Sequence, residues 1–326
     1  MLKSIVIGVG AGLVSALLLL SIATGTGIGL TLGLLAAVPS LIAGLGWGVP
    51  AASAAALVAA GIPLLVGSLP PALVHLIAVG VPAVAFSHYA LLWREAGPDG
   101  TREWYPLGRI VTAAAVWAGV IGAIVLLQIK AQLGASDVAD MVDKLKVPMQ
   151  AWMKRFEGML AEPMKAGDIE NLARVSVLML PGMFATVWLG FIAVNAYVAG
   201  RVTALSGQLE RPWPDLSELR LPRLMPVAFM VSVLLAYVGG IPGLIASGFV
   251  SAFTFAYVLV GLAIIHNVTR GLVIRPMLLA AVYSALIFLG LIASPVLALI
   301  GLAEPFSPLR RKPPPAGQGG GAPGPD

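Results

Sequence analysis

The sequence predicts an all-α protein, a polytopic transmembrane helical bundle with eight or nine membrane-embedded segments and an amphipathic helical segment between the fifth and sixth spans. Hydrophobic residues make up 59% of the 326 residues and charged residues only 11%, whereas about a quarter of a soluble domain is charged. The 20 Lys and Arg and the 15 Asp and Glu all lie outside nine apolar stretches. A charge at the centre of a spanning helix costs about 2.5–3.5 kcal/mol on insertion scales, which explains this segregation.

Each apolar stretch is expected to form a helix in the membrane, because a spanning helix needs roughly 17–25 mainly apolar residues. In chain order the stretches are Ser4–Ile22, Thr26–Leu45, Pro50–Val66, Leu69–Trp93, Ile110–Gln128, Val175–Gly200, Leu224–Val238, Gly243–Asn267 and Pro276–Leu302. The seventh stretch is short, and the second is rich in glycine. As an alternative to nine crossings, one of these two stretches is a re-entrant segment, which would leave eight crossings. We expect the first stretch to remain as a span, with a cleaved signal peptide as the alternative.

One transmembrane domain is expected over residues 1–305. Residues 131–174 form its extramembrane amphipathic insertion. Residues 306–326 contain three consecutive prolines and three consecutive glycines, a composition typical of a disordered tail.

Basic residues gather in alternate connections between the stretches: Lys3, Arg94, Arg102, Arg109, Arg201, Arg211, Arg220, Arg223, Arg270 and Arg275. Because Lys and Arg concentrate in cytoplasmic loops, the N-terminus is expected in the cytoplasm. The side of the C-terminus stays open, because Arg310, Arg311 and Lys312 would lie outside if all nine stretches cross. The net charge of +5 is scattered among loops, so no nucleic-acid partner is predicted.

The insertion has an apolar face at helical spacing: Val138, Met141, Val142, Leu145, Met149, Trp152, Phe156, Met159 and Leu160. Pro148 is expected to divide it into two helices. One interpretation is a helix pair on the bilayer surface. The other is that Met141, Leu145, Trp152 and Phe156 form a lid over an extracytoplasmic cavity or a docking face for a partner.

Small residues recur every four positions along the first two stretches. One ridge contains Gly8, Gly12 and Ala16, and another contains Gly25, Gly29 and Gly33. Such ridges let helix backbones approach closely in lipid. Packing within the chain is the simpler interpretation, and docking of a membrane partner on the first ridge is the alternative. Prolines at Pro82, Pro181 and Pro295 predict interrupted helices.

Four polar residues at membrane depth are candidate ligand-binding residues: His75, Asn195, His266 and Asn267. A polar group inside a bundle is costly without a partner, and it can instead serve to join helices. The chain has no cysteine, and its three histidines are not spaced four residues apart, so no metal site and no cofactor are predicted.

Several functional classes are disfavoured. No Asp or Glu lies within the apolar stretches, although ion-coupled pumps commonly place acids there. The chain has no Gly-x-x-x-x-Gly-Lys-Ser/Thr loop for ATP hydrolysis. No acid–base pair or activated nucleophile is visible at depth, so an enzyme is not predicted.

Four short motifs carry a family resemblance: Leu41–Gly48, Asn195–Arg201, Gly261–His266 and a tail of the form Phe306…Arg310-Arg311. Together they resemble the uncharacterised bacterial YybS-like membrane protein family, which is similar at a distance to the S components of energy-coupling-factor transporters. This resemblance implies a location in the bacterial inner (cytoplasmic) membrane, a substrate pocket open to the outside and a first helix whose small residues face a coupling partner.

Two functions are therefore carried forward. The first is an integral inner-membrane solute-binding or permease-type component that acts with a separate energising partner, such as a membrane coupling protein or ATPase, on an unidentified small-molecule substrate. The alternative is a non-transporting membrane scaffold or assembly factor. Both place the chain in the lipid bilayer.

Overall fold

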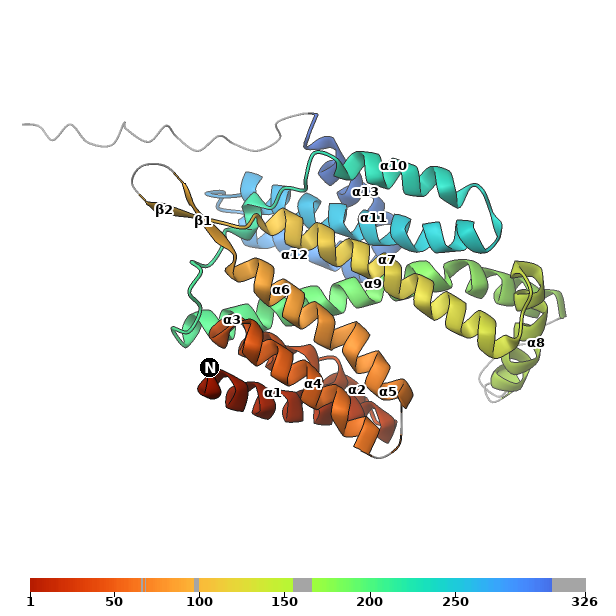
Figure 1. The fold of residues 1–326 in the computed structure, drawn as a ribbon. Helices are drawn as coiled ribbons and strands as arrows, with labels where there is room; N and C mark the ends of the chain where they lie inside the picture. Colours follow the sequence, from red (N-terminus) through yellow and green to blue (C-terminus); the bar gives the residue numbers. More distant parts are fainter. Residues whose placement is uncertain (66, 68, 97–99, 155–165, 307–326) are drawn as a thin grey trace, which may run out of the picture. The chain divides into compact units, whose positions relative to one another are not determined.

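The computed structural model describes residues 1–306 apart from residues 66, 68, 97–99 and 155–165 (Figure 1). Over the described residues the chain is helical apart from one short β-hairpin, which confirms the all-α prediction. The helices group into two compact units. The first comprises Met1–Pro214 and Arg220–Ala256, and the second comprises Asp215–Leu219 and the chain from Tyr257 on. The predicted Pro- and Gly-rich tail lies outside the described residues from residue 307 on.

The first unit contains most of the elements. They are α1 (Leu2–Leu20), the 3₁₀ helix η1 (Ser21–Thr24), α2 (Gly27–Gly33), α3 (Ala37–Trp47), α4 (Val49–Leu65), α5 (Leu69–His75), the π-helical turn η2 (Leu76–Gly80), α6 (Val81–Leu91), β1 (Trp93–Ala96), β2 (Thr101–Trp104), α7 (Leu107–Leu133), α8 (Val138–Lys154), α9 (Ala166–Leu205), α10 (Met225–Ala236) and the start of α11 (Gly240–Val268). The second unit contains η4 (Leu216–Glu218), the end of α11, α12 (Arg275–Phe288) and α13 (Gly290–Ala303).

Six helical segments of the described chain are long and apolar enough to cross a membrane: Leu2–Thr24, Gly27–Trp47, Leu69–Leu91, Leu107–Leu133, Gly167–Leu205 and Gly240–Val268. Four further apolar helices, α4, α10, α12 and α13, are shorter. The 12 residues of α10 span about 18 Å, against about 30 Å of hydrocarbon. The structure thus supports a polytopic membrane protein with six candidate spans, and it does not confirm eight or nine.

Two of the predicted helices are broken at points that composition and periodicity do not indicate. Thr26–Leu45 contains a tight turn at Leu34–Ala36, where the N–H groups of Leu35 and Ala36 bond to the carbonyls three residues earlier, those of Leu32 and Gly33, instead of four residues earlier as in an α-helix. Pro276–Leu302 divides into α12 and α13 at Leu289. Each of these two helices has 14 residues, or about 21 Å of helix.

The expected division at Pro148 is wrong for the described residues, because α8 runs unbroken through this proline from Val138 to Lys154. Proline removes one helical N–H and leaves the carbonyl four residues earlier without its usual partner. Pro148 lies on the exposed side of α8, where a carbonyl can be hydrated. The helix therefore tolerates the proline.

The glycine ridge of α1 packs against α4, and Figure 1 shows the two helices side by side. A side-chain carbon at Gly12 would lie 2.5 Å from the Ala55 carbonyl oxygen, and one at Gly8 would meet the Ala51 carbonyl. Ala16 continues the same buried face. This ridge therefore serves helix packing within the chain.

The second ridge differs from the expectation at Gly25. This residue follows η1 with a φ of 65°, a left-handed backbone that favours glycine, so it belongs to a turn instead of a helix face. Gly29 and Gly33 share a face of α2. Added side-chain carbons there would meet Ser21 and Ile22, which fixes α2 close to η1 and the end of α1.

The apolar face of α8 packs against α7 and α9. Met141 and Val142 are buried in a cluster with Leu126, Ala173 and Val177, and Leu145 packs beside it. Trp152 is 56% exposed near the helix end, and Phe156 lies outside the described residues. Of the four residues of the predicted lid or docking face, Met141 and Leu145 therefore pack against other helices of the first unit.

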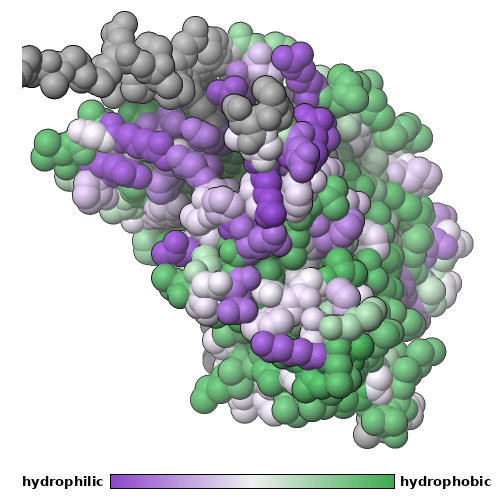
Figure 2. Space-filling model, turned by 60° about the vertical axis from the view of Figure 1, so that its left-hand side comes forward, coloured by the Kyte–Doolittle hydropathy of each residue, from purple (hydrophilic) through white to green (hydrophobic). Residues whose placement is uncertain are grey.

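The polar loop Arg94–Arg109 contains a feature that the sequence did not predict, the β1–β2 hairpin, in which Trp93 pairs with Trp104. Arg94 forms an ion pair with Glu103, and the Arg102 guanidinium lies 4.2 Å from the Trp93 ring centroid while also pairing with Glu210. Figure 2 shows hydrophilic side chains gathered next to broad apolar surfaces. Arg–aromatic groups of this kind are typical of a membrane–water interface.

In the second unit, glycines allow close contact between α11 and α13. A side-chain carbon at Gly261 on α11 would meet the Leu297 carbonyl of α13, and one at Gly301 would meet the Tyr257 carbonyl. The two helix backbones therefore touch directly, as small residues allow in lipid.

Candidate functional site

The segment that positions the site is the interrupted span α5–η2–α6. Pro82 has no N–H, so the carbonyls of Ala78 and Ile77, four and five residues earlier, have no helical donor at that position. The Trp188 indole Nε1 donates to the Ala78 carbonyl at 2.9 Å, and the Trp117 Nε1 donates to the Ile77 carbonyl at 3.0 Å. The π-helical turn is thus held by side chains from α9 and α7, and π-turns occur frequently at functional sites.

His75 ends α5 immediately before this turn and is completely buried. Its Nε2 lies 3.5 Å from the Ser15 Oγ of α1, at the long limit of a hydrogen bond. Ser15 Oγ donates its own proton to the Ala36 carbonyl at 2.5 Å. Ser15 can then only accept from His75, which places the imidazole proton on Nε2 and leaves a lone pair on Nδ1. This Nδ1 is buried and has no hydrogen-bond partner among the described residues.

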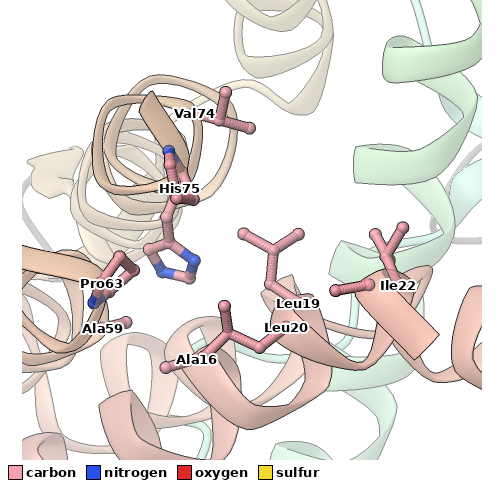
Figure 3. Close-up of a pocket in the computed structure, with 10 residues that line it drawn as sticks. Ala16, Leu19, Leu20, Ile22, Ala59, Pro63, Val74 and His75 are labelled. Atoms are coloured by element: carbon pink, nitrogen blue, oxygen red, sulfur yellow. The ribbon is translucent and has the colours of Figure 1, made fainter. Parts of the chain in front are cut away.

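A cavity of about 310 Å³ lies beside the His75 ring (Figure 3). Figure 3 shows the imidazole directed between α1 and α4, with Ala59 and Pro63 on one side and Leu19 on the other. Apart from His75, the lining residues are apolar: Ala16, Leu19, Leu20, Ile22, Ala23, Ala59, Pro63, Pro71 and Val74. Small-molecule sites are typically apolar pockets of this size or larger with a few polar groups that orient the ligand.

One wall of the cavity reaches the outer surface of the first unit. Leu20 and Ile22 both line the cavity and are 37% and 41% exposed. They belong to the candidate span Leu2–Thr24, whose outer surface faces lipid when the span crosses the membrane. A molecule dissolved in the bilayer would therefore reach the cavity past these two side chains.

Asn195 stabilises the turn at Leu34–Ala36. It is 1% exposed, and its Nδ2 donates to the Leu34 carbonyl and to the Phe191 carbonyl, each at 2.8 Å. Its Oδ1 is buried with no partner among the described residues. Ser15 and Asn195 thus bind two carbonyls of the same turn, from α1 and α9, and Asn195 does not line the cavity.

His266 and Asn267 lie in the second unit near the end of α11. His266 Nε2 is 3.0 Å from the Tyr283 hydroxyl of α12. The Asn267 Oδ1 is buried and has no partner in the described part of the chain. No three His, Asp or Glu side chains of the described residues lie close enough together to hold a metal ion.

Comparison with known families adds one decisive observation. The family model for DUF2232, described as predicted membrane protein, matches residues 13–304. The chain belongs to this family. The DUF2232 match extends from the middle of α1 to the end of α13 and therefore includes both units and the whole cavity. No curated protein and no solved structure matches the chain.

Sequence reasoning missed the residues that support the DUF2232 cavity and turn, namely Ser15, Trp117 and Trp188. A signal for the two tryptophans exists, because a buried indole N–H generally requires an acceptor, and both lie inside apolar stretches. Nothing in the sequence indicates which carbonyl each indole binds. Those acceptors are 40 and 110 residues away.

Proposed function

We propose that this DUF2232 protein is a solute-binding or permease-type component of the bacterial cytoplasmic membrane and that it acts with a separate energising partner. The observation that carries the proposal is the buried Nδ1 of His75, an acceptor without a donor, at the wall of an apolar cavity. An unpaired polar group in such surroundings costs free energy, which a ligand donor would recover. The proposal assigns no chemical step to the chain.

The cavity defines the chemistry of the ligand. Nine of its ten lining residues are apolar, so the body of the ligand is apolar. The lone pair on His75 Nδ1 selects a hydroxyl or amide N–H donor on that body. A strongly charged solute does not fit, because the lining offers no charged side chain to offset its loss of water.

The proposed partner follows from the resemblance to S components and from the lack of an ATP-binding loop in the chain. Because α4 covers Gly8 and Gly12, a partner would contact another side of α1. Val6, Leu13 and Leu17 are 62%, 46% and 67% exposed and form a suitable apolar surface.

Replacement of His75 tests the site. We expect the His75→Leu variant to lose a small molecule that copurifies with the wild-type protein in mild detergent. The substitution deletes the hydrogen-bond acceptor and replaces it with an apolar side chain of similar size. The loss should be at least about tenfold, as expected for one hydrogen bond in an apolar site. Mass spectrometry of the extracted small molecules measures it.

His88→Leu is the matched control, because His88 is an exposed histidine of α6 beside Tyr89. This variant should retain the molecule at the wild-type level. Equal retention in both variants, with both folded by size-exclusion chromatography, would contradict a site at His75.

The scaffold alternative is favoured by a different observation, the direct backbone contact of α1 with α4 at Gly8 and Gly12 and of α11 with α13 at Gly261 and Gly301, which leaves no space at these points. The same purification separates the two functions. Recovery of a copurifying ATPase together with a small molecule supports transport. Recovery of assembly proteins with no small molecule supports the scaffold.

The proposed orientation has an independent test, because the chain has no native cysteine and each introduced cysteine is then the only one. We expect Arg94→Cys in the hairpin to react with a membrane-impermeant maleimide only after the cells are opened. Gln150→Cys on the exposed side of α8 should react in intact cells. When the four apolar stretches before the hairpin all cross, the N-terminus and the hairpin lie on the same side, and the reverse pattern would then place the N-terminus outside. The wild-type chain serves as the unlabelled control.

A further inference from the structure

The second unit contains a cluster of cationic and hydrogen-bonding side chains where α11 ends and α12 begins. His266 and Tyr283 are joined by the 3.0 Å contact between Nε2 and the hydroxyl. Their rings also meet edge to face, with centroids 6.0 Å apart. Arg270 lies in the short connection after α11, and Arg275 is the first residue of α12. None of these four residues lines the His75 cavity.

The charges in this cluster do not balance. Arg270 forms an ion pair with Asp215, and its guanidinium lowers the pKa of that carboxyl, so Asp215 is ionised at neutral pH and neutralises Arg270. Arg275 forms no ion pair with an acidic side chain in the described part of the chain, and its Nε is buried without an acceptor there. A partly buried guanidinium without an acceptor is costly, so an anion from outside the described chain would stabilise it.

The start of α12 adds to this positive potential. Arg275 is the first residue of α12, and its N-cap residue, Ile274, supplies no side-chain cap. The helix dipole favours an anion at that end. The backbone adds little to this, because the Arg275 N–H donates to the Leu272 carbonyl and Pro276 has no N–H. When the His266 Nε2–H donates to the Tyr283 oxygen, the hydroxyl proton of Tyr283 is left to donate to the same anion.

We propose that Arg275, His266 and Tyr283 form a binding site for a phosphate or phosphodiester group, which we call the α11–α12 site. A guanidinium presents paired N–H donors that match phosphate oxygens, and a tyrosine hydroxyl adds a directed donor. The site lies at the end of the candidate span Gly240–Val268, where phospholipid phosphates are found at a membrane surface. The group therefore belongs either to a lipid headgroup or to a free phosphate. The inference does not depend on the cavity or on transport.

Native mass spectrometry of the full-length protein in detergent tests the site, with phosphatidylglycerol as the probe and diacylglycerol as the phosphate-free comparison. We expect the wild-type protein to retain phosphatidylglycerol and not diacylglycerol. Arg275→Gln should reduce this retention by about tenfold or more, the loss expected for a charge-assisted hydrogen bond. Tyr283→Phe, which removes only an oxygen atom from a side chain that is 43% exposed, should reduce it several-fold without unfolding the protein.

Arg94→Gln is the matched control, because it removes one positive charge from an exposed arginine in the hairpin of the other unit. A second measurement compares the melting temperature in sodium phosphate and in sodium chloride at equal ionic strength. A rise in phosphate that Arg275→Gln abolishes, without retention of phosphatidylglycerol, identifies a free phosphate. Equal lipid retention in wild type and Arg275→Gln with no phosphate effect overturns the proposal, and so does an equal loss in Arg94→Gln.

Discussion

Gly12→Ala is expected to destabilise the protein strongly, although alanine is the better helix former. The added methyl carbon would lie 2.5 Å from the Ala55 carbonyl oxygen and 2.9 Å from the Val58 Cβ, both on α4. Because a backbone carbonyl cannot turn aside as a flexible side chain can, α1 and α4 must separate along their contact. Overpacking of this kind costs about 1–3 kcal/mol. Thermal unfolding of the purified protein in detergent measures the effect as a lower melting temperature.

Gly10→Ala provides the matched control on the same helix. A side-chain carbon at Gly10 would have no atom of the described residues within 4 Å, so the substitution only gains helix propensity, about 0.5–1 kcal/mol. The two alanine variants should therefore shift the melting temperature in opposite directions. Shifts of the same sign and size would show that α1 does not lie against α4 through its Gly8–Gly12 face.

The second large effect is expected at the π-turn, where Trp188→Phe should leave the Ala78 carbonyl without its indole donor. An unpaired buried carbonyl costs about 1–3 kcal/mol, and the loss of the larger ring adds to this. The Ala78 carbonyl depends on the indole because Pro82, four residues later, has no N–H to donate to it. Pro82→Ala restores that N–H and should make the carbonyl less dependent on the indole.

A double-mutant cycle isolates this coupling. Trp188→Phe should lower the free energy of unfolding by about 1 kcal/mol less in the Pro82→Ala background than in the wild-type background. Urea or thermal unfolding of the four variants in one detergent gives the four values. Equal costs in the two backgrounds would mean that the indole and the proline act independently, which would contradict the proposed coupling.

Much of the helical architecture was predictable, because an apolar segment in lipid has to pair its own backbone groups and so becomes a helix. Ile110–Gln128 lies within α7, and Val175–Gly200 lies within α9. Composition does not determine where a helix breaks. The turn at Leu34–Ala36 has no proline, and it is stabilised by Asn195 from a distant helix. The four-residue strands of the hairpin are too short for a periodic pattern.

The candidate site was predictable only as single residues. His75 and Asn195 stand out because they are polar side chains among apolar ones, and both are buried. Their partners are separated from them along the chain, Ser15 by 60 residues and Leu34 by 161. No spacing rule connects positions so far apart, so neither the tautomer of His75 nor the cavity beside it follows from the sequence.

These separations have a consequence for biosynthesis. The Leu34 carbonyl obtains its donor only when Asn195 has been made, and the Ala78 carbonyl obtains its donor only with Trp188. At about 5–20 residues per second, the ribosome needs roughly 10–30 s to make the 161 residues between Leu34 and Asn195. The turn at Leu34–Ala36 and the π-turn therefore lack these donors until α9 has been made, and truncation before α9 should leave a less stable chain that quality-control proteases recognise.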